Sequence, residues 1–188
     1  MTSPLPNSRR NEFSPEERKI LLDLAHQSID RALNGRSFSP ESPNSHLAEN
    51  RGAFCTLYVY GQLRGCVGYI FPVTPLFLTV AETARAAAFD DPRFPALTRD
   101  EAASLKVSLS VLSALTPIQP EQIEIGTHGL LVNFAGRRGL LLPQVATEHN
   151  WDRITFLEQT CIKAGLPAHA WKTAATLEGF TAEVFGEA

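Results

Sequence analysis

The segment GQLRGCVGYIFP (61–72) alternates like a β-strand, yet it carries residues that can do chemistry. Arg64 and Cys66 stand two residues apart, and on one strand such side chains lie on the same face, with Cα atoms roughly 6.5 to 7 Å apart. A guanidinium that close favours a thiolate over a thiol, and a thiolate is a nucleophile or a metal ligand. We therefore predict Cys66 as a catalytic residue and Arg64 as a ligand-binding residue beside it.

Two glycines, Gly65 and Gly68, flank this cysteine. They remove side-chain bulk and would let a ligand approach the backbone, so both are predicted to bind a ligand. Packing explains the same residues as well: Cys66 is then a small buried hydrophobe, the glycines relieve crowding against a helix, and Arg64 pairs with a carboxylate such as Asp91. The residue types leave both interpretations open.

Two residues from a later part of the chain could complete a site. His128, in GTHGLLV, lies on a turn before a strand, and an ordinary histidine pKa of roughly 6.5 suits a general base that meets Cys66 across a sheet. A turn histidine more commonly makes a structural hydrogen bond, so His128 is a catalytic candidate with that alternative. Gln144 follows a proline that ends an expected strand and could face the same cleft as a ligand-binding residue.

The segment DDPRF (90–94) offers a second pair of charged candidates. Asp91 and Arg93 could form an anion-binding or hinge element beside the strand of Cys66, which makes both predicted ligand-binding residues. The alternative is a helix end, where Pro92 blocks continuation of the helix and Arg93 satisfies its final carbonyls.

Composition limits the classes of function. The 188 residues carry a formal net charge of -3 without a basic stripe, so nucleic-acid binding is not expected. Three cysteines without CxxC spacing indicate reduced thiols in a cytoplasmic protein, and the absence of HExxH or His-x-His spacing predicts no metal site. No signal peptide and no apolar run of roughly 20 residues is present, so we expect no contact with a membrane. No pattern in the sequence identifies a cofactor.

The elements that must position these residues alternate between helices and hairpins. Expected helices run from 14 to 35, from 74 to 89, over a short turn at 98–101, and from 152 to 165; Ser14 with Glu17 and Thr98 with Glu101 have the spacing of capping boxes. Expected strands are 53–60, 63–70, 105–112, 129–134, 138–143 and 177–185. The predicted fold class is α+β, with antiparallel sheets flanked by helices in a single domain with two lobes around a cleft. Residues 1–12 are predicted to be a flexible arm and residues 13–188 the domain.

The hairpin around Cys66 also has a predicted register. Glycine in the first position of a two-residue loop, Gly61–Gln62, suits a type II′ turn. Tyr60 then faces Leu63 and Leu57 lies opposite Cys66, so that Arg64, Cys66 and Leu57 share one face.

Six segments in order, GAFCTL, LRGCVG, AAAFDDPRF, THGLLV, GLLLPQVA and WDRITFLEQTCIKAGLP, resemble the AMMECR-type domain family, whose bacterial and archaeal members are called AmmeMemoRadiSam system protein A. The resemblance covers about 52–185 and extends more loosely through the first helix; LRGCVG closely resembles the family hallmark, with Val67 where isoleucine is common. It implies a two-lobed α+β fold with a cleft lined by this motif, and association with a Memo-like protein and a radical SAM protein. The family has no established activity. We expect a ligand-binding and thiol-dependent catalytic cleft for a small-molecule or macromolecular ligand; the alternatives are a non-catalytic adaptor that docks those partners, and a component of RNA modification.

Overall fold

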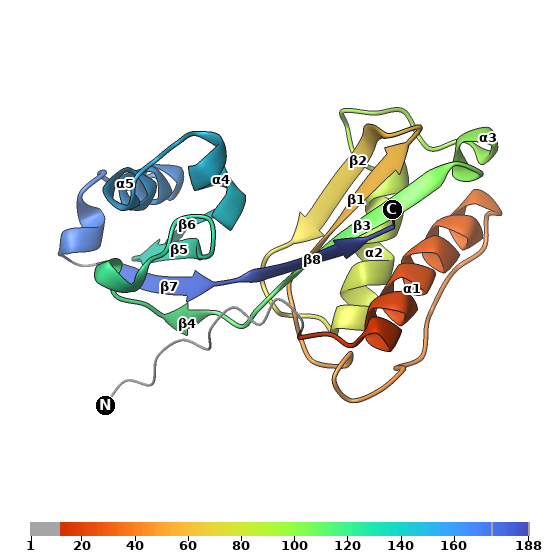
Figure 1. The fold of residues 1–188 in the computed structure, drawn as a ribbon, viewed down its shortest axis with the longest axis horizontal. Coiled ribbons are helices and arrows are strands. Elements are labelled where there is room, and N and C mark those ends of the chain that lie inside the picture. The colour runs from red at the N-terminus through yellow and green to blue at the C-terminus, as the bar shows by residue number, and fades with distance from the viewer. Residues whose placement is uncertain (1–11, 174, 188) are drawn as a thin grey trace. The chain divides into compact units, whose positions relative to one another are not determined.

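A computed structural model of the protein describes residues 12–173 and 175–187. The predicted flexible arm therefore lies outside the described residues, apart from Glu12. The chain divides into two compact units (Figure 1): the described part of the first is 12–112 with 183–187, and that of the second is 113–173 with 175–182. The predicted α+β class with antiparallel sheets and flanking helices is confirmed. In the part of the chain that the structure describes, no helix has the length and apolar character needed to cross a membrane.

The first unit is a four-stranded sheet with two helices on one face. Its elements are α1 (Pro15–Leu33), β1 (Ala53–Val59), β2 (Gln62–Tyr69), α2 (Leu76–Phe89), α3 (Arg99–Ala102), β3 (Leu105–Leu112) and β8 (Ala182–Gly186), and the strand order is β2-β1-β3-β8. The capping box at Ser14 begins α1 as predicted: the Ser14 hydroxyl accepts from Glu17 N at 3.2 Å, and Glu17 Oε2 accepts from Ser14 N at 3.0 Å.

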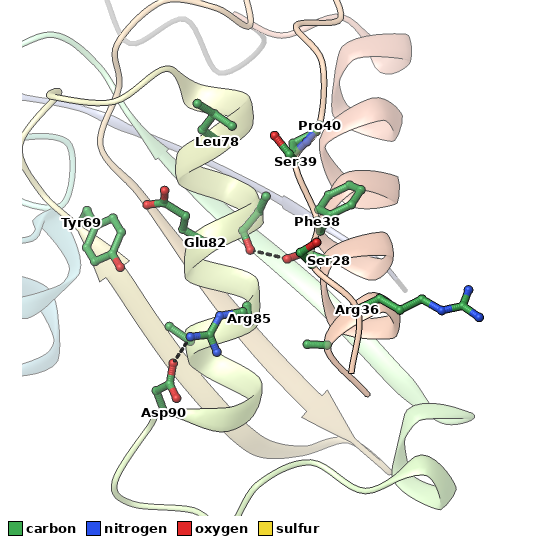
Figure 2. A pocket seen from close by; sticks show the side chains of 14 residues that line it. Ser28, Arg36, Phe38, Ser39, Pro40, Tyr69, Leu78, Glu82, Arg85 and Asp90 are labelled. Carbon is green, nitrogen blue, oxygen red and sulfur yellow. Dashed lines mark hydrogen bonds and ion pairs between the residues drawn. The ribbon is translucent and has the colours of Figure 1, made fainter. Parts of the chain in front are cut away.

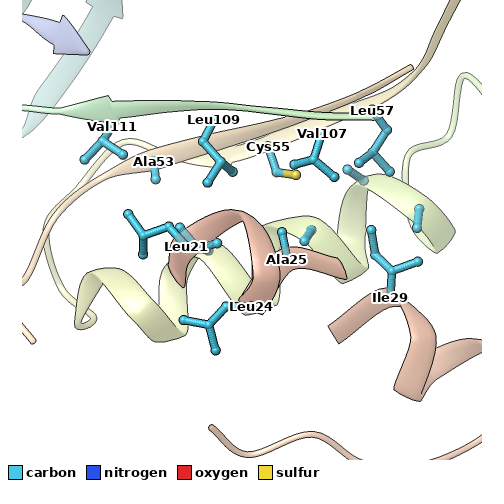
Figure 3. Packing of buried hydrophobic residues seen from close by; sticks show 14 of the residues in the cluster. Leu21, Leu24, Ala25, Ile29, Ala53, Cys55, Leu57, Val107, Leu109 and Val111 are labelled. Atoms are coloured by element: carbon cyan, nitrogen blue, oxygen red, sulfur yellow. The ribbon is translucent and has the colours of Figure 1, made fainter. Parts of the chain in front are cut away.

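The core of this unit lies between the sheet and α1 and α2 (Figure 3). Every second residue of β1 is buried, which is the period of a strand with one covered face. The covered face of α2 is rich in alanine, which lets this helix approach the sheet closely. The buried residues shown include Leu21, Leu24, Ala25, Ile29, Ala53, Cys55, Leu57, Val107, Leu109 and Val111.

The hairpin differs from its predicted register. Val59 pairs with Gln62, so the loop is Tyr60–Gly61, and both loop residues have positive φ, 51° and 75°, as a type I′ turn requires. The register then shifts by one residue between Leu57 and Tyr58, because Arg64 is an extra, bulged residue on β2. The prediction that the loop was Gly61–Gln62 is therefore wrong.

The second unit is a four-stranded sheet with helices from the later part of the chain. Its described elements are β4 (Thr116–Pro117), a 3₁₀ turn at Pro120–Gln122, β5 (Gly129–Phe134), β6 (Arg137–Leu141), α4 (Pro143–Glu148), α5 (Arg153–Lys163), a 3₁₀ turn at Ala170–Lys172 and β7 (Thr176–Phe180), with strand order β4-β7-β5-β6. Two predictions fail in this region. Pro143 begins a helix instead of ending a strand, since proline suits the first helical turn. The expected last strand is interrupted at Thr181, so that β7 and β8 belong to different sheets.

Candidate functional site

Cys55 and Cys66 lie on opposite faces of the first sheet. Residues that pair directly across an antiparallel ladder share a face, and Cys66 pairs with Thr56 while Cys55 pairs with Val67. Cys55 is fully buried on the face that α1 and α2 cover, as Figure 3 shows. Cys66 is half-buried on the other face. The bulge is the cause, because it moves Cys66 from its predicted position opposite Leu57 to a position opposite Thr56.

Three small polar side chains form a row across the face that carries Cys66. Thr56 pairs with Cys66 on one side and with Ser108 of β3 on the other. The Cys66 sulfur lies 3.3 Å from Thr56 Oγ1, within hydrogen-bonding distance for sulfur. The row therefore presents one thiol and two hydroxyls on a face that the helices leave uncovered.

The backbone of Cys66 is held at the free edge of the sheet by Asp91 and Arg93. The Cys66 N–H donates to Asp91 Oδ2 at 2.9 Å, and Arg93 Nη2 donates to the Cys66 carbonyl at 3.1 Å. Arg93 also donates to both carboxylate oxygens of Asp91, from Nε at 3.0 Å and from Nη2 at 2.7 Å. We call this arrangement the Asp91–Arg93 clamp. At the edge of a sheet, the backbone N–H and carbonyl of a residue such as Cys66 have no neighbouring strand to bond to. The clamp provides the partners of both groups at Cys66.

The electrostatics of the clamp follow from these contacts. The hydrogen bonds from Arg93, and then the one from the Cys66 N–H, hold the pKa of Asp91 far below its ordinary value, so this carboxylate is ionised. The pKa of Arg93 is raised, chiefly by Asp91 and to a smaller extent by Cys66. Arg93 is thus the cation that interacts with Cys66.

Arg64 is held away from that role by another carboxylate. Its Nε donates to Glu101 Oε1 at 2.7 Å, and Nη2 donates to Glu101 Oε2 at 3.1 Å and to the Ala96 carbonyl at 3.3 Å. The alternative partner expected for Arg64, Asp91, is not its partner. The bidentate contact with Arg64 lowers the pKa of Glu101 to about 2. Nη1 of Arg64 is buried without a hydrogen-bond partner among the described residues.

Packing against protein atoms explains both glycines. A Cβ on Gly65 would lie 2.0 Å from the carbonyl oxygen of Ala87 in α2, and a Cβ on Gly68 would lie 2.1 Å from Cδ1 of Phe54. Gly65 thus lets α2 reach the strand, and Gly68 leaves room for an aromatic ring on the other face. The space that we predicted beside these glycines for a ligand is filled by the protein.

His128 and Gln144 belong to the second unit. His128 is 8% exposed, and its ring Nδ1 accepts from the backbone N–H of Glu124 at 3.0 Å, while the backbone N–H of His128 donates to the Glu124 carbonyl at 3.0 Å. Burial lowers the pKa of His128, against a smaller opposite effect of Glu124. These contacts close the turn between Glu124 and His128, which is the structural hydrogen-bonding role predicted from the sequence as the alternative to a general base. Gln144 is exposed in α4, where its carbonyl accepts from the Thr147 hydroxyl at 2.7 Å.

A separate hollow of about 510 Å³ lies between α2, the end of α1 and the following segment (Figure 2). Its floor includes Ser28, whose hydroxyl donates to the Ala81 carbonyl at 2.6 Å, and its rim includes the ion pair of Arg85 with Asp90 at 3.2 Å. Cys66 is not among the lining residues. The hollow is large enough for a small molecule, but it does not contain the predicted site.

Sequence reasoning missed Thr56, Ser108 and the second role of Glu101. The capping box identified Glu101 as a helix cap, which it is, but not as the partner of Arg64. Thr56 and Ser108 alternate with buried residues on their strands, and only the register places them beside Cys66. Within residues 12–173 and 175–187, no group of three His, Cys, Asp or Glu side chains is arranged to hold a metal ion.

Known proteins resemble this chain in both sequence and fold. The family model AMMECR1 matches residues 22–185. A protein of Methanopyrus kandleri is 41% identical over 185 residues, covering 92% of this chain and 89% of the relative. A protein of Aquifex aeolicus is 38% identical over 177 residues, covering 89% of this chain and 91% of the relative. The crystal structure of an uncharacterized protein of Pyrococcus horikoshii matches with a TM-score of 0.73 at 38% identity, over 89% of each chain.

Proposed function

The chain belongs to the AMMECR1 family, and we propose that it binds a small molecule at the Cys66 row and reacts with it through the Cys66 thiol. One observation carries the proposal. The thiol lies on the face of the sheet that α1 and α2 do not cover, beside a hydroxyl, with its backbone held on the edge side by the Asp91–Arg93 clamp.

The clamp supports a reactive role because it fixes the backbone that carries the Cys66 side chain. A reactive side chain must be held by its neighbours in the geometry of reaction, and a strand backbone bonded on both edges moves less than a free edge. The clamp also places a cation at this residue, since Arg93 Nη2 lies 3.1 Å from the Cys66 carbonyl oxygen. Arg64, Gly65 and Gly68 support the strand in this proposal instead of touching the ligand.

The test is the rate at which iodoacetamide alkylates each cysteine of the folded protein, measured by mass spectrometry and compared with a cysteine-containing peptide at the same pH. We expect Cys66 to react faster than the peptide thiol and the two buried cysteines, Cys55 and Cys161, to remain unmodified. Cys66→Ala is the control that must abolish the fast reaction. If Cys66 reacts no faster than the peptide, the thiol function is excluded.

A docking function is the second candidate, and the tip of the hairpin favours it. Tyr60 is 77% exposed, and Tyr58 and Leu63 beside it are also exposed. Such exposed apolar side chains occur at protein interaction sites. The partners in this proposal are the Memo-like protein and the radical SAM protein that the family resemblance implies, in the cytoplasm.

The docking proposal needs substitutions that leave the sheet intact. Arg64→Ala is unsuitable because it would remove the partner of Glu101 and destabilise the strand. Tyr60→Ser and Leu63→Ser change exposed side chains, and we expect them to weaken capture of the Memo-like protein at least tenfold, while Cys66→Ala leaves it unchanged. Undiminished capture by the double variant would remove this candidate.

A further inference from the structure

The hydrogen bonds around Cys66 leave donors without acceptors. Asp91 accepts four hydrogen bonds, two on each oxygen: Oδ1 from Arg93 N and Nε, and Oδ2 from Cys66 N and Arg93 Nη2. Glu101 likewise accepts from Arg64 and from Thr98. Both carboxylates are therefore fully used, since a carboxylate offers about four acceptor positions.

The unused donors belong to the two arginines. Arg93 Nη1 makes no hydrogen bond among the described residues, and 56% of the Arg93 side chain is exposed to solvent. Arg64 Nη1 is also without a partner among the same residues, but it is buried and takes no part in the binding proposed below. Water can satisfy the exposed Arg93 donor, and a bound carboxylate or phosphate oxygen, the strongest acceptor for a guanidinium, can replace that water.

The clamp also fixes where the exposed donor lies. Arg93 Nη2 donates to the Cys66 carbonyl at 3.1 Å, and the guanidinium is planar, so the position of Nη1 relative to the Cys66 backbone is fixed as well. An anion bound at Nη1 would lie close to Cys66 and would displace no hydrogen bond of the clamp.

We propose that the ligand of the Cys66 row is a small electrophile that carries an anionic group, with Arg93 Nη1 binding the anion and the Cys66 sulfur attacking the neighbouring carbon. This inference rests on the proposed function. For a carbonyl substrate, the thiol gives its proton to solvent, the sulfur–carbon bond forms as the carbonyl π bond breaks, and the oxygen takes a proton from solvent. No oxidant or other reactant is required.

A pair of alkylating reagents that differ in charge tests the inference. Iodoacetate and iodoacetamide form the same sulfur–carbon bond with loss of iodide, but only iodoacetate carries an anion. The measured quantity is the ratio of their second-order rate constants at Cys66 in the full chain. We expect a ratio about tenfold higher in the wild type than in Arg93→Gln, which corresponds to one charge-assisted hydrogen bond, and a ratio that falls as sodium chloride is added.

The ratio cancels any general change of reactivity that a looser clamp causes. Arg36→Gln is the matched control, because it removes the same charge from an exposed arginine elsewhere in the unit, and it should leave the ratio unchanged. Equal ratios in the wild type and Arg93→Gln, with Cys66 still reactive, would overturn the anionic substrate and leave the proposed function standing. Failure of both reagents at Cys66 would overturn the proposed function itself. If Arg93→Gln does not fold, the salt dependence of the wild-type ratio decides: a ratio independent of salt contradicts the inference.

Discussion

The two faces of the first sheet are built from the same strands but differ in their chemical environment. On the covered face, Cys55 is surrounded by aliphatic side chains, and burial raises the pKa of its thiol strongly. On the other face, Cys66 has a hydroxyl at 3.3 Å and a clamped backbone. The two cysteines therefore have different chemical environments. The bulge at Arg64 determines the face on which Cys66 lies.

We expect alanine substitutions of the two glycines of β2 to give the largest difference in stability between the two faces. In Gly65→Ala the new methyl group would meet the backbone carbonyl of Ala87, which cannot move without shifting α2. We expect a loss of about 3 kcal/mol or more in the free energy of unfolding. In Gly68→Ala the methyl group meets the ring of Phe54, a side chain that can rotate, and we expect about 1 kcal/mol. Urea denaturation of both variants measures the difference, and equal losses would contradict the assignment of Gly65 to the covered face.

The ion pair of Arg64 with Glu101 should show itself as a dependence of stability on pH. The folded pKa of Glu101 is about 2, below its ordinary value of 4.5, so the stabilisation is complete above pH 4.5 and is lost as the pH falls towards 2. At pH 6 we expect Glu101→Gln to cost about 2 kcal/mol, because it leaves a buried guanidinium poorly paired. The difference from the wild type, measured by denaturation between pH 6 and 2.5, should shrink as the pH falls. Asp100→Asn, at an exposed neighbouring position, is the control; a difference that is constant with pH would argue against the pair.

Serine substitutions compare the two cysteines directly. Cys55→Ser places a hydroxyl in the aliphatic core without a built partner and should cost about 2 kcal/mol. Cys66→Ser keeps a polar atom next to the Thr56 hydroxyl and should cost less than about 0.5 kcal/mol. Thermal denaturation of the two variants provides the comparison, and a larger loss for Cys66→Ser would show that Cys66 is the structural cysteine.

Much of the fold follows from local patterns in the sequence. The capping boxes at Ser14 and Thr98 and the alternation of β1 and β3 correctly locate their elements, because each pattern depends on residues close in the chain. The hairpin turn and the bulge were missed, since Tyr60 gives no sign of its positive φ and Arg64 none of its extra position. The helix at Pro143 was missed because proline both ends strands and begins helices.

The candidate site was predicted in part. The sequence singled out Cys66, Asp91 and Arg93, and the structure brings these three together. It also assigned a ligand role to Arg64, which depends on a distant partner, Glu101, that spacing cannot reveal. The roles of Cys66 in reaction and of Arg93 in binding stay predictions until they are measured.

The most direct measurement counts the thiols that N-ethylmaleimide labels in the folded protein. All three cysteines are free, two of them buried and one half-buried, so the account predicts one adduct, on Cys66, in the native state and three in guanidinium chloride. Labelling of Cys55 or Cys161 before Cys66, or no labelling at all without denaturant, would contradict it.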